Sequence, residues 1–143
     1  MVGGLFALAA SIMATNRSAK HNLELAKQER SALASTEREV AIAAIKHEVD
    51  IILTLMVGAR GTNVLRVYPT SLWERYSHLV VVALDEDTAL HLIAGYAAVL
   101  IANSFAEYDL QKLGHGMGHV NDDYREQIDS ASDSLRNAVA GME

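Results

Sequence analysis

Two histidines are the sharpest candidates for chemistry in this chain. His115 and His119 stand four residues apart in the segment His-Gly-Met-Gly-His. On a helix, such a pair can coordinate one metal ion, as in the H-E-x-x-H pattern of zinc enzymes. Here glycines separate the pair and the general-base glutamate is missing, so we predict a loop that binds no stoichiometric metal. The alternative is a metal-binding enzyme or sensor around His115 and His119, with oxygen ligands from the nearby acids Glu107, Asp109, Asp122 and Asp123.

The other histidines have ordinary interpretations. His91 follows Asp87 by one helical turn and adjoins an apolar stretch, where a tuned base could lie. We predict instead a histidine at the edge of the core, bonded to a backbone group. His47, beside Glu48 and Asp50, is predicted to lie on a solvated helix face.

Signatures of covalent and cofactor chemistry are absent from the sequence. The chain has no cysteine, and it has neither a glycine-rich phosphate loop nor a G-x-S-x-G nucleophile elbow. We therefore predict no catalytic, cofactor-binding or metal-binding residue, no cofactor, and no enzymatic activity.

The charge balance argues against nucleic acid as a partner. The formal net charge is −6, whereas a nucleic-acid-binding protein needs a basic face. Residues 1–75 hold nine of the twelve Lys and Arg residues, and residues 76–143 hold eleven of the eighteen acids. The acidic half is predicted to be a solvated surface.

The N-terminus is uncharged from Val2 to Ala14, and residues 1–16 are predicted to form an apolar anchor or assembly segment. A helix over Val2–Ala14 would rise about 20 Å, short of the ~30 Å hydrocarbon core of a bilayer. Arg17 and Lys20 follow it, and the positive-inside rule then places the rest of the chain in the cytoplasm. The prediction is a single-pass protein of the bacterial inner membrane with a cytoplasmic C-terminal domain; the alternative is a soluble cytoplasmic assembly in which this segment packs.

The chain is predicted to be all-α, with about four helices in antiparallel hairpins and a long N-terminal stalk helix. Alanine and leucine dominate the apolar residues, and there is one proline in the whole chain. Residues 17–39 are too polar to bury much and are predicted to be a stalk or coiled-coil strand. Thr36 to Glu39 matches a capping box, so a helix either restarts there or continues through it.

Residues 40–143 are predicted to form the helical domain. The domain begins with a helix whose apolar residues are spaced three and four apart, the pattern of a packed helix seam. Two glycines, Gly58 and Gly61, should end this helix. Residues 62–68 are predicted to be a connector, and a second capping box, Ser71 to Glu74, should start a helix at about Leu72. The seam residues are Ile42, Ile45, Val49, Ile52 and Met56.

Two further helices complete the domain. Acids at 85–87 suit the start of a helix over 86–113, which is apolar nearly all round and is predicted to be buried by its neighbours instead of spanning a membrane. Asn121 or Asp122 should cap the last helix. The apolar face of that helix consists of Tyr124, Ile128, Ala131, Leu135, Ala138 and Val139.

The order of these motifs resembles a group of uncharacterised bacterial proteins, which are membrane-anchored and helical and carry a P-T-x-x-W motif after a coiled stalk. Within roughly residues 2 to 108, the segments that carry the resemblance are Asn16-Arg17-Ser18, His21 to Leu25, Ala43 to Asp50, Tyr68 to Tyr76 with Pro69-Thr70-Ser71-Leu72-Trp73 inside it, and then Tyr96 and Asn103. The resemblance implies a single N-terminal span and a cytoplasmic helical domain, and it implies no activity.

The sequence thus predicts a membrane-anchored or self-associating helical protein with a structural or interaction role. We expect homo-oligomers formed through the apolar N-terminus and the stalk, with membrane lipid as the other partner. Gly3, Ala7 and Ser11 share one helix face that permits close helix contact, and the seam from Ile42 to Met56 would supply a second association surface. A further alternative is a phage or mobile-element accessory protein that acts at membranes.

Overall fold

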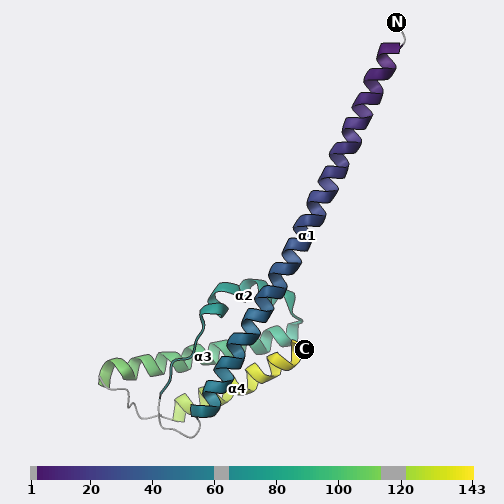
Figure 1. Cartoon of the computed structure of the whole chain (residues 1–143). Coiled ribbons are helices and arrows are strands. Elements are labelled where there is room, and N and C mark those ends of the chain that lie inside the picture. The colour runs from purple at the N-terminus through teal and green to yellow at the C-terminus, as the bar shows by residue number, and fades with distance from the viewer. Residues whose placement is uncertain (1–2, 60–64, 114–121) are drawn as a thin grey trace. The chain divides into compact units, whose positions relative to one another are not determined.

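A computed structural model describes residues 3–59, 65–113 and 122–143, with the backbone alone for residues 3–16 and 113. These residues form four helices and no strand, which confirms the all-α prediction (Figure 1). The helices are α1 (Gly3–Ala59), α2 (Ser71–Ala83), α3 (Glu86–Leu113) and α4 (Asp122–Gly141). The chain divides into two compact units, residues 1–39 and residues 40–143.

The long N-terminal helix predicted from the sequence is α1, which runs without a break through the capping box at Thr36. The Thr36 hydroxyl donates to the carbonyl oxygen of Ala32 at 3.0 Å, the back-bond of a threonine inside a helix. No helix restarts there, because the local capping pattern is weaker than the continuing ladder. Within residues 17–39, the side chains are exposed except for two half-buried alanines, Ala26 and Ala34.

The core of the second unit is assembled from all four helices and the connector before α2. Of the seam predicted over Ile42–Met56, all residues but the half-buried Ile42 are buried here, and all five pack within their own chain. The prediction that this seam is a surface for association is therefore wrong: Ile45, Val49 and Ile52 have no exposed area left. The buried apolar residues are Ala41, Ile45, Val49, Ile52 and Met56 of α1, Leu65 and Tyr68 of the connector, Val80 of α2, Ala89, Leu92, Tyr96, Ala98, Val99, Ala102 and Ala106 of α3, and Tyr124, Ile128, Ala131, Leu135 and Ala138 of α4.

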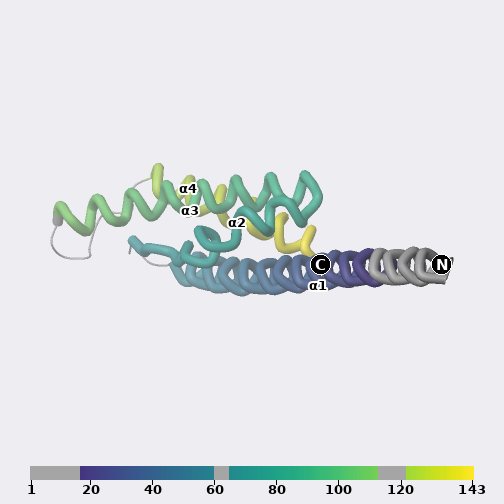
Figure 2. Tube along the Cα trace, turned by 90° about the horizontal axis from the view of Figure 1, so that it is seen from above, coloured from purple at the N-terminus to yellow at the C-terminus, as the bar shows by residue number. Residues whose placement is uncertain are grey.

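The helices α3 and α4 form an antiparallel hairpin, and they lie side by side in both Figure 1 and Figure 2. Gly95 allows a close approach of the two helices, because a Cβ atom there would stand 2.5 Å from Cδ2 and 2.7 Å from Cγ of the fully buried Leu135. Gly141, at the far end of α4, meets Thr88 near the start of α3 in the same way. Glycine at these two positions therefore sets the distance between the helices.

Two helix starts show different ways of binding free N–H groups. Asp85 caps α3 as the acidic cluster predicts: its Oδ1 accepts from the N–H of Thr88 at 3.0 Å. These hydrogen bonds hold the pKa of the exposed Asp85 carboxyl below its usual value. At α2, the capping box predicted at Ser71 is wrong. Thr70 is the N-cap and makes no side-chain cap bond, and its hydroxyl donates to Glu74 at 3.2 Å.

Only one side of α3 is covered. Among the described residues, the stretch Glu86–Lys112 of α3 is long and apolar enough to cross a membrane, judged by length and composition alone. Half of its most apolar 18 residues are buried inside the protein. The prediction that neighbours bury this helix holds for the face toward the core alone. Several large apolar side chains on the other face are exposed, namely Leu90, Ile93, Leu100, Ile101 and Tyr108.

Candidate functional site

The side chain with the most concentrated polar contacts is Glu48, on the core-facing side of α1. It is 2% exposed and lies one turn from Ile45 and one turn from Ile52. Its Oε1 accepts from the N–H of Leu72 at 2.8 Å. Its Oε2 accepts from the N–H of Trp73 at 2.9 Å. A carboxylate of α1 therefore supplies the cap that the sequence around α2 lacks.

A tyrosine and a tryptophan complete this cluster. The hydroxyl of Tyr96 in α3 donates to Oε2 of Glu48 at 2.8 Å. The ring of Trp73 stacks on the ring of Tyr96, with centroids 4.4 Å apart and planes 9° from parallel. Burial of the phenol, together with its bond to the carboxylate, raises the pKa of Tyr96 far above its usual value. The phenol therefore stays protonated and remains a donor.

We name Glu48, Leu72, Trp73 and Tyr96 the Glu48 brace, because together they tie α1, α2 and α3. Three donors converge on the two oxygens of one buried carboxylate, and the positive end of the α2 dipole favours the negative charge there. Both oxygens are already engaged, so the carboxylate is bound as a structural acceptor.

A second polar cluster fixes the connector of residues 65–70. The side-chain oxygen of Asn103 accepts from the N–H of Tyr68 at 2.7 Å, and its amide donates to the Tyr68 carbonyl at 2.9 Å. The Tyr124 hydroxyl donates to the carbonyl of Arg66 and accepts from its N–H, both at 3.1 Å. Two helices thus satisfy an extended backbone that has no strand beside it. Among the described residues, every buried side-chain nitrogen or oxygen has a partner.

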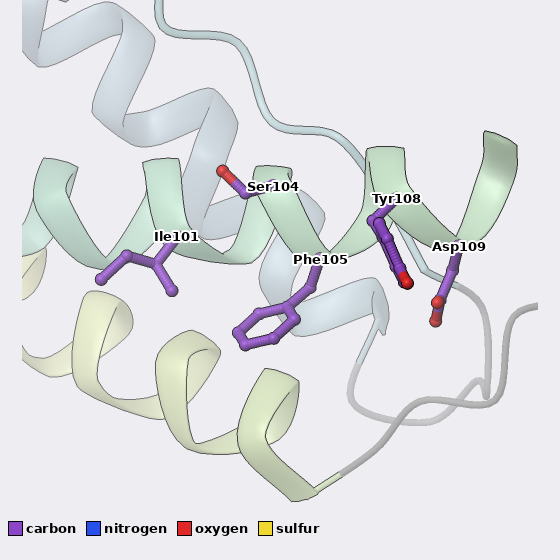
Figure 3. Close-up of a pocket in the computed structure, with 5 residues that line it drawn as sticks. All are labelled: Ile101, Ser104, Phe105, Tyr108 and Asp109. Carbon is purple, nitrogen blue, oxygen red and sulfur yellow. The ribbon is translucent and has the colours of Figure 1, made fainter. Parts of the chain in front are cut away.

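An open pocket of about 460 Å³ lies beside the C-terminal half of α3 (Figure 3). Figure 3 shows the ring of Phe105 pointing toward α4, with the ring of Tyr108 and the carboxylate of Asp109 further along α3. The remaining lining residues are Ile101 and Ser104, and the wall is mostly apolar. A pocket of this composition suits an apolar side chain more than a charged ligand.

The structure contradicts two of the ordinary interpretations made from the sequence. His91 is exposed, so the prediction of a histidine at the core edge is wrong. Glu48 is buried, whereas its neighbours His47 and Asp50 are solvated as predicted. The signal for Glu48 was its spacing, since it falls on the same face as Ile45 and Ile52.

The predicted metal alternative is tested only in part. His115 and His119 lie outside the described residues. Of the acids proposed to assist them, Glu107, Asp122 and Asp123 are exposed and Asp109 is half-buried. Over residues 3–59, 65–113 and 122–143, no three His, Cys, Asp or Glu side chains gather closely enough to hold a metal ion.

Comparison with known proteins adds no function to this geometry. No family model matches the chain, and no curated protein or solved structure shows significant similarity to it. The resemblance to membrane-anchored proteins with a P-T-x-x-W motif therefore remains a prediction from the motifs. In this structure, that motif forms the end of the connector and the first turn of α2, where Trp73 belongs to the Glu48 brace.

Proposed function

We propose that the chain is a self-associating helical protein with a structural or interaction role, attached to a membrane by residues 1–16. The observation that carries this proposal is the exposure of α1 between residues 17 and 39. Leu23 is 57% exposed and Leu33 is 62% exposed on an unbroken helix. A polar helix of this length gains most of its stability from packing, so exposed leucines on it call for a partner.

The spacing of these residues favours a coiled coil. Leu23, Ala26 and Leu33 recur at intervals of three and seven, which places them on one face of α1. Leu25 is 43% exposed but lies on the other side of the helix, two residues from Leu23. A second copy that packs along the face of Leu23 and Leu33 would cover these two leucines and leave the basic and acidic residues of the stalk in water.

Attachment to a membrane is supported by the composition of the N-terminal segment. Residues 2–14 carry no charge, and Arg17 and Lys20 follow at the point where a cytoplasmic side would begin. An uncharged helix of that length needs lipid or copies of itself to cover its side chains. We place the protein at the bacterial inner membrane with residues 40–143 in the cytoplasm.

Deletion of residues 1–16 tests this function. The full chain should sediment with membranes and stay oligomeric in detergent, whereas the deleted chain should be soluble and of lower order. Far-UV circular dichroism should show that the helices of residues 40–143 persist, because the core lies there. A full-length chain that light scattering finds monomeric in water, without detergent, would refute both the attachment and the association.

A further inference from the structure

The uncovered side of α3 carries a row of exposed apolar side chains. We call it the α3 stripe and define it by its exposed members Leu90, Ile93, Ala94, Ala97, Leu100, Ile101, Ser104 and Tyr108. From Leu90 to Tyr108 is five full turns, so the two side chains point in the same direction. Through these turns, the middle of the stripe carries no charged side chain.

The α3 stripe approaches the size of the apolar patches that often serve as interaction sites. A helix with its side chains is about 10 Å wide and rises 1.5 Å per residue, so the stripe covers a strip of about 27 Å by 10 Å. Apolar patches of a few hundred Å² are the largest that monomeric proteins usually expose. One such strip on each of two partners covers about 540 Å² in all, below the roughly 1,200 Å² at which standard interfaces begin, so this contact acts beside the association of the stalk and does not replace it.

Charges along one edge of the α3 stripe indicate which partner fits. Asp87 and Lys112 lie on this edge, at nearly equal distances on either side of the middle of the stripe. His91 and Asp109 form a second such pair nearer to the middle. When two copies of α3 pack antiparallel, Asp87 of each faces Lys112 of the other, and His91 faces Asp109. A parallel pairing would instead set this edge of the two copies on opposite sides of the interface and leave both charge pairs unmade.

The small and large residues of the stripe fit the same arrangement. Antiparallel packing about the middle of α3 sets Ala97 of one copy opposite Ile101 of the other, and Ala94 opposite the half-buried Phe105 at the edge of the stripe. Leu90 of one copy then faces Tyr108 of the other, beside the open pocket of Figure 3. Alternation of small and large side chains across facing positions is how packed helices interdigitate.

Charge also argues against a lipid surface as the occupant. Acids flank the stripe at both ends, at 85–87 and at Glu107 and Asp109. Anionic lipid headgroups attract basic flanks and repel such acidic ones. We therefore propose that the α3 stripe binds the α3 stripe of a second copy of this chain, antiparallel and about a two-fold axis. This deepens the proposed self-association by assigning it a surface in the second unit, and it rests on that proposal.

Cysteine cross-linking in the full chain tests the inference, because the native sequence has no cysteine. A disulfide needs Cα atoms within about 7 Å, so it reports which positions face each other. In detergent, Ala97→Cys mixed with Ile101→Cys should cross-link, because these two positions face each other across the two-fold axis. Leu90→Cys should not cross-link with itself, and it should do so when mixed with Tyr108→Cys. The control Val82→Cys, on the exposed side of α2, should remain uncross-linked.

An association measurement supplies a second readout. Ala97→Glu places two carboxylates near the axis, and it should raise the dissociation constant about tenfold or more in dilute detergent. Val82→Glu, at a side chain that is 75% exposed, should change it less than about twofold. Analytical ultracentrifugation of the full chain over a range of concentrations gives both values.

The outcomes separate this inference from the proposed function. Cross-linking of Leu90→Cys with itself would show a parallel pairing and overturn the inference. Failure of Ala97→Cys to cross-link with Ile101→Cys in chains that remain oligomeric would place the association elsewhere, as would quenching of a label at position 101 by a lipid-borne quencher. In both cases the inference falls and the proposed function stands, whereas a full chain that is monomeric in water removes both.

Discussion

Removal of the Glu48 carboxylate should be among the most damaging single changes in this fold. The carboxylate accepts the N–H groups of Leu72 and Trp73 and the hydroxyl of Tyr96. Each donor left without a partner costs about 1–3 kcal/mol. Because the α2 N–H groups are partly buried and can regain some water, we expect Glu48→Ala to lower the free energy of unfolding by about 3–5 kcal/mol. That is a large part of the 5–15 kcal/mol typical of a native domain.

Two other substitutions at this position separate hydrogen bonding from packing. Glu48→Met keeps most of the volume and offers no strong acceptor, so it should lose nearly as much stability as Glu48→Ala. Glu48→Gln retains one acceptor oxygen but turns an NH₂ group toward a donor, and it should cost about 1.5–3 kcal/mol. The matched control is Glu74→Gln at an exposed carboxylate, which should change stability by about 0.5 kcal/mol at most.

Urea denaturation of the full chain provides the measurement, followed by far-UV circular dichroism and by fluorescence. Trp73 is the only tryptophan and stacks within the Glu48 brace, so its emission reports this cluster directly. The order of stability should be wild type, then Glu48→Gln, then Glu48→Met and Glu48→Ala. A Glu48→Met protein as stable as the wild type would refute the reasoning, because it would show that the brace contributes through packing alone.

Three other predictions concern a helix contact, a titration and a metal. Gly95→Ala should destabilise the α3–α4 hairpin by about 1–3 kcal/mol despite the better helix propensity of alanine, whereas Gly58→Ala, with open space around its Cβ position, should be neutral or stabilising; thermal unfolding of both variants gives the comparison. The pKa of Asp85 is lowered by folding, so its contribution to stability is present above the unfolded-state pKa and is lost as pH falls through the folded-state pKa. Asp85→Asn should therefore be less stable than the wild type at neutral pH, and the gap should close in acid; a gap that stays constant with pH would contradict the assignment. Elemental analysis of the purified full chain should find no stoichiometric metal, and one zinc per chain that disappears in His115→Ala and His119→Ala would reverse that prediction.

The positions of the helices were predictable because the sequence carries local signals for them. The acids at 85–87 predict the start of α3, and the glycine at position 114 predicts its end. The structure has this helix over Glu86–Leu113. The face of α4 follows from spacing alone, from Tyr124 to Ala138. Caps, breaks and apolar periodicity act over a few residues, so a single sequence is enough to reveal them.

The Glu48 brace was not predictable by the same means. Its hydrogen bonds join residues 24, 25 and 48 positions apart, and no local pattern encodes such contacts. Glu48 is a charged residue between the exposed His47 and the buried Val49, and its spacing from Ile45 and Ile52 indicates its face but none of its partners. The exposed side of α3 was not predictable either. A helix that is apolar nearly all round gives no sequence signal of which face its neighbours cover.

The connector before α2 has a consequence for the order in which the protein is made. The backbone of Arg66 and Tyr68 is bonded by Tyr124 and Asn103, which leave the ribosome much later. By contrast, Glu48 emerges before the first turn of α2 that it caps. During translation, α1 and α2 can therefore meet early, while the connector keeps its amides in water until α3 and α4 are synthesised. A chain truncated before α4 would leave the Arg66 amide open to solvent exchange, although that residue lies well upstream of the truncation.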